Sequence, residues 1–256
     1  MRIVRHGLWA ALSVLALGLA APGAGAQDLT ILSGGAVKAG LTDTVPAYEK
    51  ATGRKVAIDY APMGALMKKL AEGAAPDLVM VTTDVVGEVE KRGFIVPGSV
   101  REVGRVGIGI AVHENAALPD ISTPDAVKRT LLAARSIVYI NPATGTSGKH
   151  FAQVLQNLGI ADAMKSKTTL LEGGYVVEPV GRGEIELGIH QITEILPVKG
   201  IKLVGPLPEA LQKVTVYVGA LTPKARDPEQ ARRFLAHLQT PESRQAFAKR
   251  GYMAGP

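Results

Sequence analysis

The chain has 256 residues and a formal net charge of +6, from 29 Lys and Arg against 23 Asp and Glu, and it contains no Cys. Without Cys it cannot form disulfides, use a thiol nucleophile or bind a metal through thiolates. Its positive charges form no Lys/Arg block and aromatic residues make up only 4% of the chain, which argues against nucleic acid as a partner.

The first 26 residues have the pattern of an export signal. Arg2 and Arg5 give a positively charged start, residues 8–20 are apolar, and residues 24–26 match the small-x-small cleavage pattern. The apolar run is shorter than the roughly 20 residues that span a membrane. We therefore predict a periplasmic (or secreted) protein, cleaved near Ala26, that has no Cys to carry a lipid anchor.

Short apolar runs alternate with amphipathic segments over the next part of the chain. Each of three predicted strands is followed by a predicted helix: strands at residues 29–32, 56–60 and 78–81, helices at 37–52, 65–72 and 84–91. Short links between strand and helix imply a parallel sheet covered by helices.

The rest of the chain predicts a second lobe and a return to the first. The apolar run at 105–112 is predicted to cross between lobes, and the alternating segment at 215–221 to cross back. Further strands are expected at 137–140, 168–171, 186–190 and 201–204, and further helices at 123–134, 228–238 and 241–249. The predicted fold is α/β, with a signal peptide (1–26), lobe I (27–104 and 216–256) and lobe II (105–215).

Residues 136–158 form the most informative stretch. A predicted strand runs into a polar loop, and a helical pattern begins beside the hydroxyls of Thr144, Thr146 and Ser147. Free N–H groups and the positive end of the helix dipole make such a helix start an anion site. A well-capped helix with a solvated Lys149 explains the pattern equally well. It is not a Walker A loop, since Ala143 stands where that motif has Gly.

Three other turns share this character. They follow predicted strands and combine small residues with backbone N–H groups or hydroxyls, at residues 33–36, 62–64 and 82–83. Ligands of open α/β sheets bind beyond the carboxyl ends of strands, so these turns are candidate anion contacts. Lys38 also lies in a first helical turn. The alternative is that each turn only reverses the chain.

His190 and Gln191 end another predicted strand. The sequence leaves two interpretations of His190 open: a packed, hydrogen-bonded side chain, or a functional one. We expect Glu178 and Glu194 to be solvated. The five His show no paired metal-ligand spacing, so neither a metal site nor a cofactor is predicted.

Three stretches resemble periplasmic molybdate-binding-type solute-binding proteins: residues 33–36, 76–78 and 183–189. The resemblance covers nearly the whole chain after the signal and implies a two-lobed type II binding protein that closes on its ligand and serves an ABC importer. It implies ligand contacts at Ser33 or Gly34, at Met63 or Gly64, at 143–145, at Tyr175-Val176 and at Gln191.

The chain departs from that family pattern. Gln191 stands where the family has Tyr, Met63 or Gly64 where it has Ser, and His190, Lys149 and His150 are additional. A small tetrahedral oxyanion needs a tight, neutral cage, so the extra cations favour an organic carboxylate over molybdate. The same superfamily is similar to a periplasmic aconitate isomerase.

Two functions therefore stay open. The preferred one is a monomeric receptor that captures a small organic anion for an ABC permease. The alternative is an isomerase that moves an allylic proton of aconitate, with His150 or His190 as the proton shuttle. The predicted ligand-binding residues are Ser33, Gly34, Gly35, Met63, Gly64, Thr82, Thr144, Gly145, Thr146, Ser147, Lys149, Tyr175 and Gln191.

Overall fold

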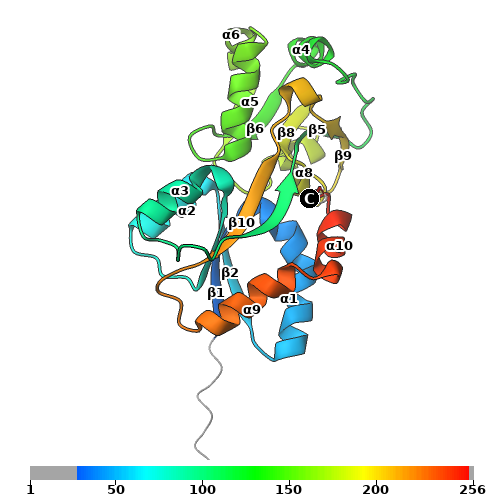
Figure 1. Cartoon of the computed structure of the whole chain (residues 1–256). Coiled ribbons are helices and arrows are strands. Elements are labelled where there is room, and N and C mark those ends of the chain that lie inside the picture. Colours follow the sequence, from blue (N-terminus) through cyan, green and yellow to red (C-terminus); the bar gives the residue numbers. More distant parts are fainter. Residues whose placement is uncertain (1–27, 254–256) are drawn as a thin grey trace, which may run out of the picture.

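The computed structural model describes residues 28–253, so the predicted export signal lies outside the described residues. The chain forms two lobes, each built on a five-stranded sheet (Figure 1). The first sheet has the order β2-β1-β3-β10-β4 and the second the order β7-β6-β8-β5-β9. In each sheet, one strand that links the lobes runs antiparallel to its two neighbours: β10 in the first and β5 in the second.

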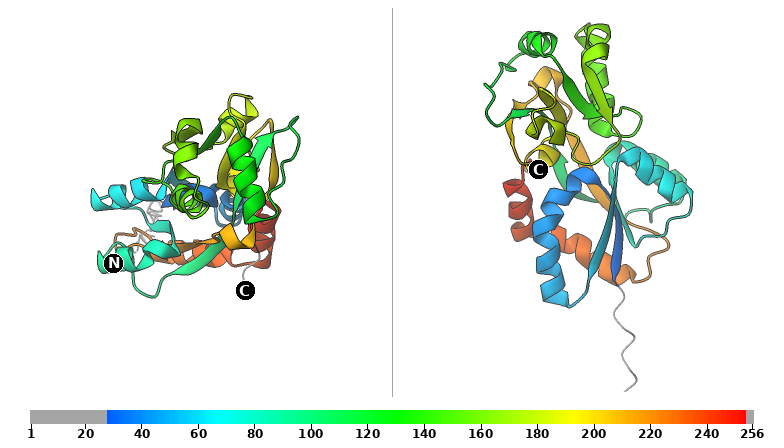
Figure 2. Two further views of the ribbon diagram at one scale, coloured as in Figure 1. Left: turned by 90° about the horizontal axis from the view of Figure 1, so that it is seen from above. Right: turned by 180° about the vertical axis from the view of Figure 1, so that it is seen from behind.

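The first lobe contains both ends of the described chain. Its strands are β1 (Leu29–Gly34), β2 (Val56–Ala61), β3 (Leu78–Thr82), β4 (Arg101–Val106) and β10 (Thr215–Leu221). Its helices are η1 (Gly35–Val37), α1 (Lys38–Thr52), α2 (Met63–Ala71), α3 (Thr83–Lys91), α9 (Pro228–Leu238) and α10 (Pro241–Lys249). Because the chain steps from β1 to one neighbour and then to the other, right-handed crossovers place α1 and α2 on opposite faces of the sheet (Figure 2).

The second lobe is one continuous segment. Its strands are β5 (Ile108–His113), β6 (Ile137–Ile140), β7 (Thr168–Leu171), β8 (Leu187–Gln191) and β9 (Ile201–Pro206). Its helices are α4 (Pro124–Ala133), α5 (Thr146–Asn157), α6 (Ala161–Met164), η2 (Lys165–Lys167), α7 (Glu178–Gly181), α8 (Ile192–Ile195) and η3 (Glu209–Leu211). Thr123 caps α4 by accepting a hydrogen bond from the Ala126 amide at 3.1 Å, with Pro124 in the first turn.

Each lobe has its own apolar core. All five residues of β3 are buried, as expected of a strand covered by helices on both faces. Phe151 and Leu131 fill the second lobe between its sheet and helices α4 and α5. The predicted fold class is therefore correct, whereas the exact lobe boundaries stay a prediction.

The lobes are joined where the sequence predicted one long apolar run. The run divides at Gly107 into β4 and β5, because the chain leaves one sheet there and enters the other. Gln212, just before the return strand, binds both backbone groups of Ile108: Ile108 N–H donates to Oε1 at 2.8 Å, and Nε2 donates to the Ile108 carbonyl at 2.9 Å. The two crossings are thus tied to each other. Within residues 28–253, no helix is long and apolar enough to cross a bilayer.

Candidate functional site

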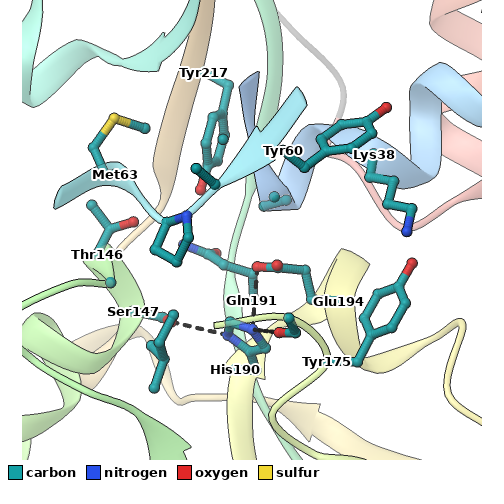
Figure 3. Close-up of a pocket in the computed structure, with 18 residues that line it drawn as sticks. Lys38, Tyr60, Met63, Thr146, Ser147, Tyr175, His190, Gln191, Glu194 and Tyr217 are labelled. Atoms are coloured by element: carbon teal, nitrogen blue, oxygen red, sulfur yellow. Dashed lines mark hydrogen bonds and ion pairs between the residues drawn. The ribbon is translucent and has the colours of Figure 1, made fainter. Parts of the chain in front are cut away.

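A cleft of about 150 Å³ lies between the two lobes (Figure 3). Much of its lining comes from the carboxyl ends of strands and from the segments after them, where ligands of open α/β sheets bind. The lining residues are Gly34, Gly35, Ala36, Lys38, Tyr60, Ala61, Pro62, Met63, Ile140, Gly145, Thr146, Ser147, Gly174, Tyr175, His190, Gln191, Glu194 and Tyr217.

The N-terminus of α5 forms one wall of the cleft. The amide of Lys149 donates to the Gly145 carbonyl at 3.0 Å, so the amides of Thr146, Ser147 and Gly148 precede the helix's own hydrogen-bond ladder. Gly148 lets this end approach β6, because a Cβ there would lie 1.8 Å from the Ile140 carbonyl oxygen. The helix start therefore offers backbone donors to an anion, beside the hydroxyl of Thr146.

A chain of three polar side chains lies beneath this helix start. Ser147 Oγ is 3.1 Å from His190 Nδ1, and His190 Nε2 is 3.3 Å from the Gly174 carbonyl oxygen. The same Nε2 lies 3.4 Å from Oε2 of Glu194, which is four residues further along the chain, in α8. The side chain of His190 is 2% exposed and that of Glu194 is 12% exposed.

Burial sets the charge of this pair. Burial lowers the pKa of His190 to about 4, against the opposing effect of the Gly174 carbonyl. Burial raises the pKa of Glu194 to about 8, and the charge of Lys38 opposes that rise. Both groups are therefore mostly neutral at pH 7, and their contact joins two neutral groups instead of an ion pair.

Lys38 provides the positive charge of the cleft. Its ammonium lies 5.2 Å from the ring centre of Tyr175 in the second lobe and 5.7 Å from that of Tyr60 in the first. Burial raises the pKa of Tyr60 to about 12 and also raises that of Tyr217, so both phenols stay protonated and can donate hydrogen bonds. The cleft thus combines a cation, two phenols and a helix N-terminus. This environment suits an organic anion, which has a carbon skeleton as well as negative charge.

Direct contacts hold the lobes together around the cleft. The Gly64 amide donates to the Thr144 carbonyl at 3.0 Å, and Thr193 Oγ1 donates to the Ala36 carbonyl at 2.9 Å. A Cβ on Gly173 would lie 2.6 Å from Pro62, so the lobes also touch at that point. The described conformation is a closed one.

The structure brings most of the predicted site residues together. Those that line the cleft are Gly34, Gly35, Met63, Gly145, Thr146, Ser147, Tyr175, His190 and Gln191. Their role as ligand contacts stays a prediction.

Other predicted residues do not line the cleft. Ser33 is buried and donates to the Gly34 carbonyl, and Thr82 is buried in β3. Gly64 and Thr144 hold the lobes to each other, as described above. Lys149 is exposed on α5. His150 places Nε2 2.8 Å from the Leu211 carbonyl oxygen, outside the cleft lining.

Sequence reasoning missed three functional candidates, Tyr60, Glu194 and Tyr217, and it noted Lys38 without including it among the predicted ligand-binding residues. The expectation that Glu194 is solvated is wrong, because the short α8 turns its side chain back into the cleft beside His190. No local signal marked Glu194, because His190 is in β8 and Glu194 in α8, so the i+4 spacing of a helix does not apply to them. Glu178 is exposed, as expected. Among residues 28–253, no three His, Asp or Glu side chains are grouped so that they could hold a metal ion.

Comparison with known proteins agrees with this geometry. A family profile described as "Bacterial extracellular solute-binding protein" matches residues 29–253. The chain is 34% identical to an aconitate isomerase of Pseudomonas sp over 234 residues, 89% of this chain and 88% of the relative. It is 26% identical to the molybdate-binding protein ModA of Azotobacter vinelandii over 248 residues, 93% of this chain and 94% of the relative.

Solved structures show the same architecture. The periplasmic molybdate-binding protein of Azotobacter vinelandii superposes with a TM-score of 0.77 at 17% identity, covering 90% of this chain and 100% of that one. At this identity the likeness establishes the fold. Together with the profile match, it confirms the predicted superfamily: the chain belongs to the bacterial extracellular solute-binding protein family, whose members bind solutes for ABC transporters.

Proposed function

We propose that the protein is an aconitate isomerase that acts outside the cytoplasm. It binds a small tricarboxylate between its lobes and moves one allylic proton, which interconverts trans- and cis-aconitate. The observation that carries this proposal is the buried Glu194 carboxyl beside His190 in the cleft that also holds Lys38. The 34% identical aconitate isomerase supports it.

The anionic part of the substrate has several partners in the cleft. Lys38 supplies a full positive charge, and the start of α5 supplies backbone amides beside Thr146 and Ser147. A second helix start, at Met63 of α2, faces the same space. These donors are distributed around the cleft, which suits carboxylates on different carbons better than one compact oxyanion.

The proton-transfer part of the proposal depends on groups that a receptor does not need. Burying a carboxyl and an imidazole costs free energy, and groups with strongly displaced pKa values gather at catalytic sites. Glu194 and His190 have pKa values displaced in opposite directions by burial. For this reason the cleft favours the isomerase, although the sequence alone favoured the receptor.

A receptor for an organic polycarboxylate, delivered to an ABC permease, is the second candidate. Its specific support is the contact between the Gly64 amide and the Thr144 carbonyl, which closes the lobes over the cleft as ligand capture requires. Both candidates predict carboxylate binding, and only one predicts turnover.

Proton NMR of the purified protein with trans-aconitate in heavy water separates them. We expect cis-aconitate to form with deuterium at the allylic carbons. Tricarballylate, the saturated analogue without a double bond, serves as the binding control, because it should raise the melting temperature without reacting. If both compounds raise the melting temperature but neither cis-aconitate nor deuterium incorporation is detected, the receptor is the remaining candidate. No shift with either compound, while molybdate gives one, would remove both carboxylate proposals.

A further inference from the structure

Glu194 occupies the junction of the two lobes. It comes from α8 in the second lobe, yet its Oε1 lies against Gly35 of the first, where an added Cβ would be 2.7 Å away. Its other oxygen, Oε2, lies 3.4 Å from His190 Nε2. The carboxyl is therefore held on both sides and faces the cleft in the closed conformation (Figure 3).

Few charged groups face this carboxyl. Lys38 of α1 opposes it electrostatically, and His190 of β8 contacts it. Tyr217 of β10 and Tyr252 near the C-terminus lie close enough to feel its charge, and burial keeps the pKa of both phenols well above 10. Glu194 is therefore the group in this cluster whose charge changes near neutral pH.

His190 is held in one state by its neighbours. With its Nε2 proton directed to the Gly174 carbonyl, its Nδ1 accepts from the Ser147 hydroxyl, so both ring nitrogens are occupied. A neutral imidazole in these bonds has no free lone pair to take a proton from a substrate. Its Nε2 also lies 3.4 Å from Glu194 Oε2, so the two acceptors share this donor and it can fix the position of the carboxyl.

We propose that Glu194 is the catalytic base that moves the allylic proton, and that His190 is its positioning residue. This inference rests on the proposed isomerase function. Ionised Glu194 takes a proton from the CH₂ group beside the double bond, and the C–H electron pair spreads over the allyl system and its carboxylate. Glu194 then delivers a proton to the far allylic carbon and is ionised again. The double bond has moved, and no co-reactant is consumed.

The environment of Glu194 suits this chemistry. A carbon acid is weak, so a base with a pKa above that of an ordinary carboxylate removes its proton more readily. Burial supplies that increase, to about 8 in the unliganded protein. Lys38 offsets the negative charge that develops on the substrate. The value of kcat/KM should therefore rise about tenfold per pH unit below pH 8 and level off above it.

Kinetics of three variants test the inference. Glu194→Gln has the shape of the neutral carboxyl, so it should bind tricarballylate as the wild type does at pH 7, while kcat falls by about 10³-fold. Glu178→Gln, which changes an exposed carboxyl of the same lobe on α7, is the matched control and should keep full activity. His190→Gln should lower kcat but keep the rise of kcat/KM toward pH 8, because the titrating group is still present.

The activities of the wild type and of E194Q separate a failure of this inference from a failure of the proposed function. If the wild type isomerises aconitate and E194Q stays within tenfold of it, this inference fails and the proposed function stands. If the wild type forms no cis-aconitate, both fail. Should E194Q not bind tricarballylate, the wild-type profile decides, and a kcat/KM that is flat between pH 6.5 and 8.5 overturns Glu194 as the base.

Discussion

The backbone amide of Gly64 in α2 donates a hydrogen bond to the carbonyl oxygen of Thr144 in the second lobe, at 3.0 Å. These residues belong to two of the turns in which the sequence predicted an anion site. Instead of lining the cleft, they join its two walls. This backbone contact, together with that of Thr193 to Ala36, therefore links closure of the lobes to formation of the site.

The Gly64→Ala substitution tests this link. A Cβ at Gly64 would lie 3.1 Å from the Ala143 carbonyl oxygen and 3.3 Å from Thr144 Cα, both backbone atoms. We expect overpacking of about 1 kcal/mol against the closed form, or roughly a fivefold loss of tricarballylate affinity by calorimetry. Gly87→Ala is the control, because an added Cβ there meets nothing within 4 Å. Equal affinities of both variants would show that this contact does not govern closure.

Two lysines in first helical turns have different predicted roles. Both lysines are exposed, but Lys38 lines the cleft between two Tyr rings, whereas Lys149 of α5 is not part of the cleft lining. Lys38→Met should weaken tricarboxylate binding by about fivefold, because an ion pair made by a solvent-exposed lysine contributes up to about 1 kcal/mol. It should also raise the pKa of Glu194 further, because Lys38 lowers it. Lys149→Met should leave the tricarboxylate affinity and the pKa of Glu194 unchanged. A larger loss of affinity with Lys149→Met than with Lys38→Met would contradict the placement of Lys38 at the ligand.

Stability should depend on pH through the buried pair. The pKa of Glu194 is about 8 in the folded protein against 4.5 for the free group, so folding retains a proton and this carboxyl costs stability as pH rises from 4.5 to 8. The pKa of His190 is about 4 against 6.5, so His190 costs stability as pH falls below 6.5. The two effects oppose each other between pH 4.5 and 6.5.

Above pH 6.5 only the carboxyl contribution changes. Urea unfolding should show the wild type losing about 2 kcal/mol relative to E194Q between pH 6.5 and 8. His150→Gln is the control. Its dependence of stability on pH should parallel that of the wild type, because the substitution leaves the buried pair intact. Identical pH curves for the wild type and E194Q would mean that Glu194 ionises with an ordinary pKa.

His150 provides a separate test of the catalytic assignment. The sequence offered it as a proton shuttle, but its Nε2 lies 2.8 Å from the Leu211 carbonyl oxygen and its side chain does not line the cleft. We expect His150→Gln to isomerise aconitate at the wild-type rate in the NMR assay. A loss of kcat comparable to that of His190→Gln would bring His150 back into the mechanism.

Local pattern was sufficient for most of the fold. Strand and helix periods near the start of the chain predicted β1, β2 and β3 with their helices, because each is specified by residues adjacent in sequence. The division at Gly107 was not predicted, because an unbroken apolar run does not reveal that its halves pair with different sheets.

The sequence predicted the site residues that lie at or just after the ends of strands, and few others. Gly34 and His190 lie at the carboxyl ends of β1 and β8, and Thr146 begins the helix after β6; the rule for open α/β sheets places such residues at the ligand. Tyr217 was missed, and Lys38 was noted but not assigned to the site, because their place depends on how the lobes meet. Glu194 was missed because a carboxylate in isolation is expected in water, and only the tertiary fold removes the water from it.

The position of β10 has a consequence for how the chain acquires its structure. β10 lies between β3 and β4 in the first sheet, although it follows them by more than the whole second lobe in sequence. As the polypeptide emerges from its N-terminus, β4 has no strand to pair with until residues 215–221 arrive. The second lobe, which is contiguous from β5 to β9, can complete its sheet first. The lobe whose synthesis begins first therefore completes its folding last. Until β10 is synthesised, the incomplete chain exposes the unpaired edges of β3 and β4.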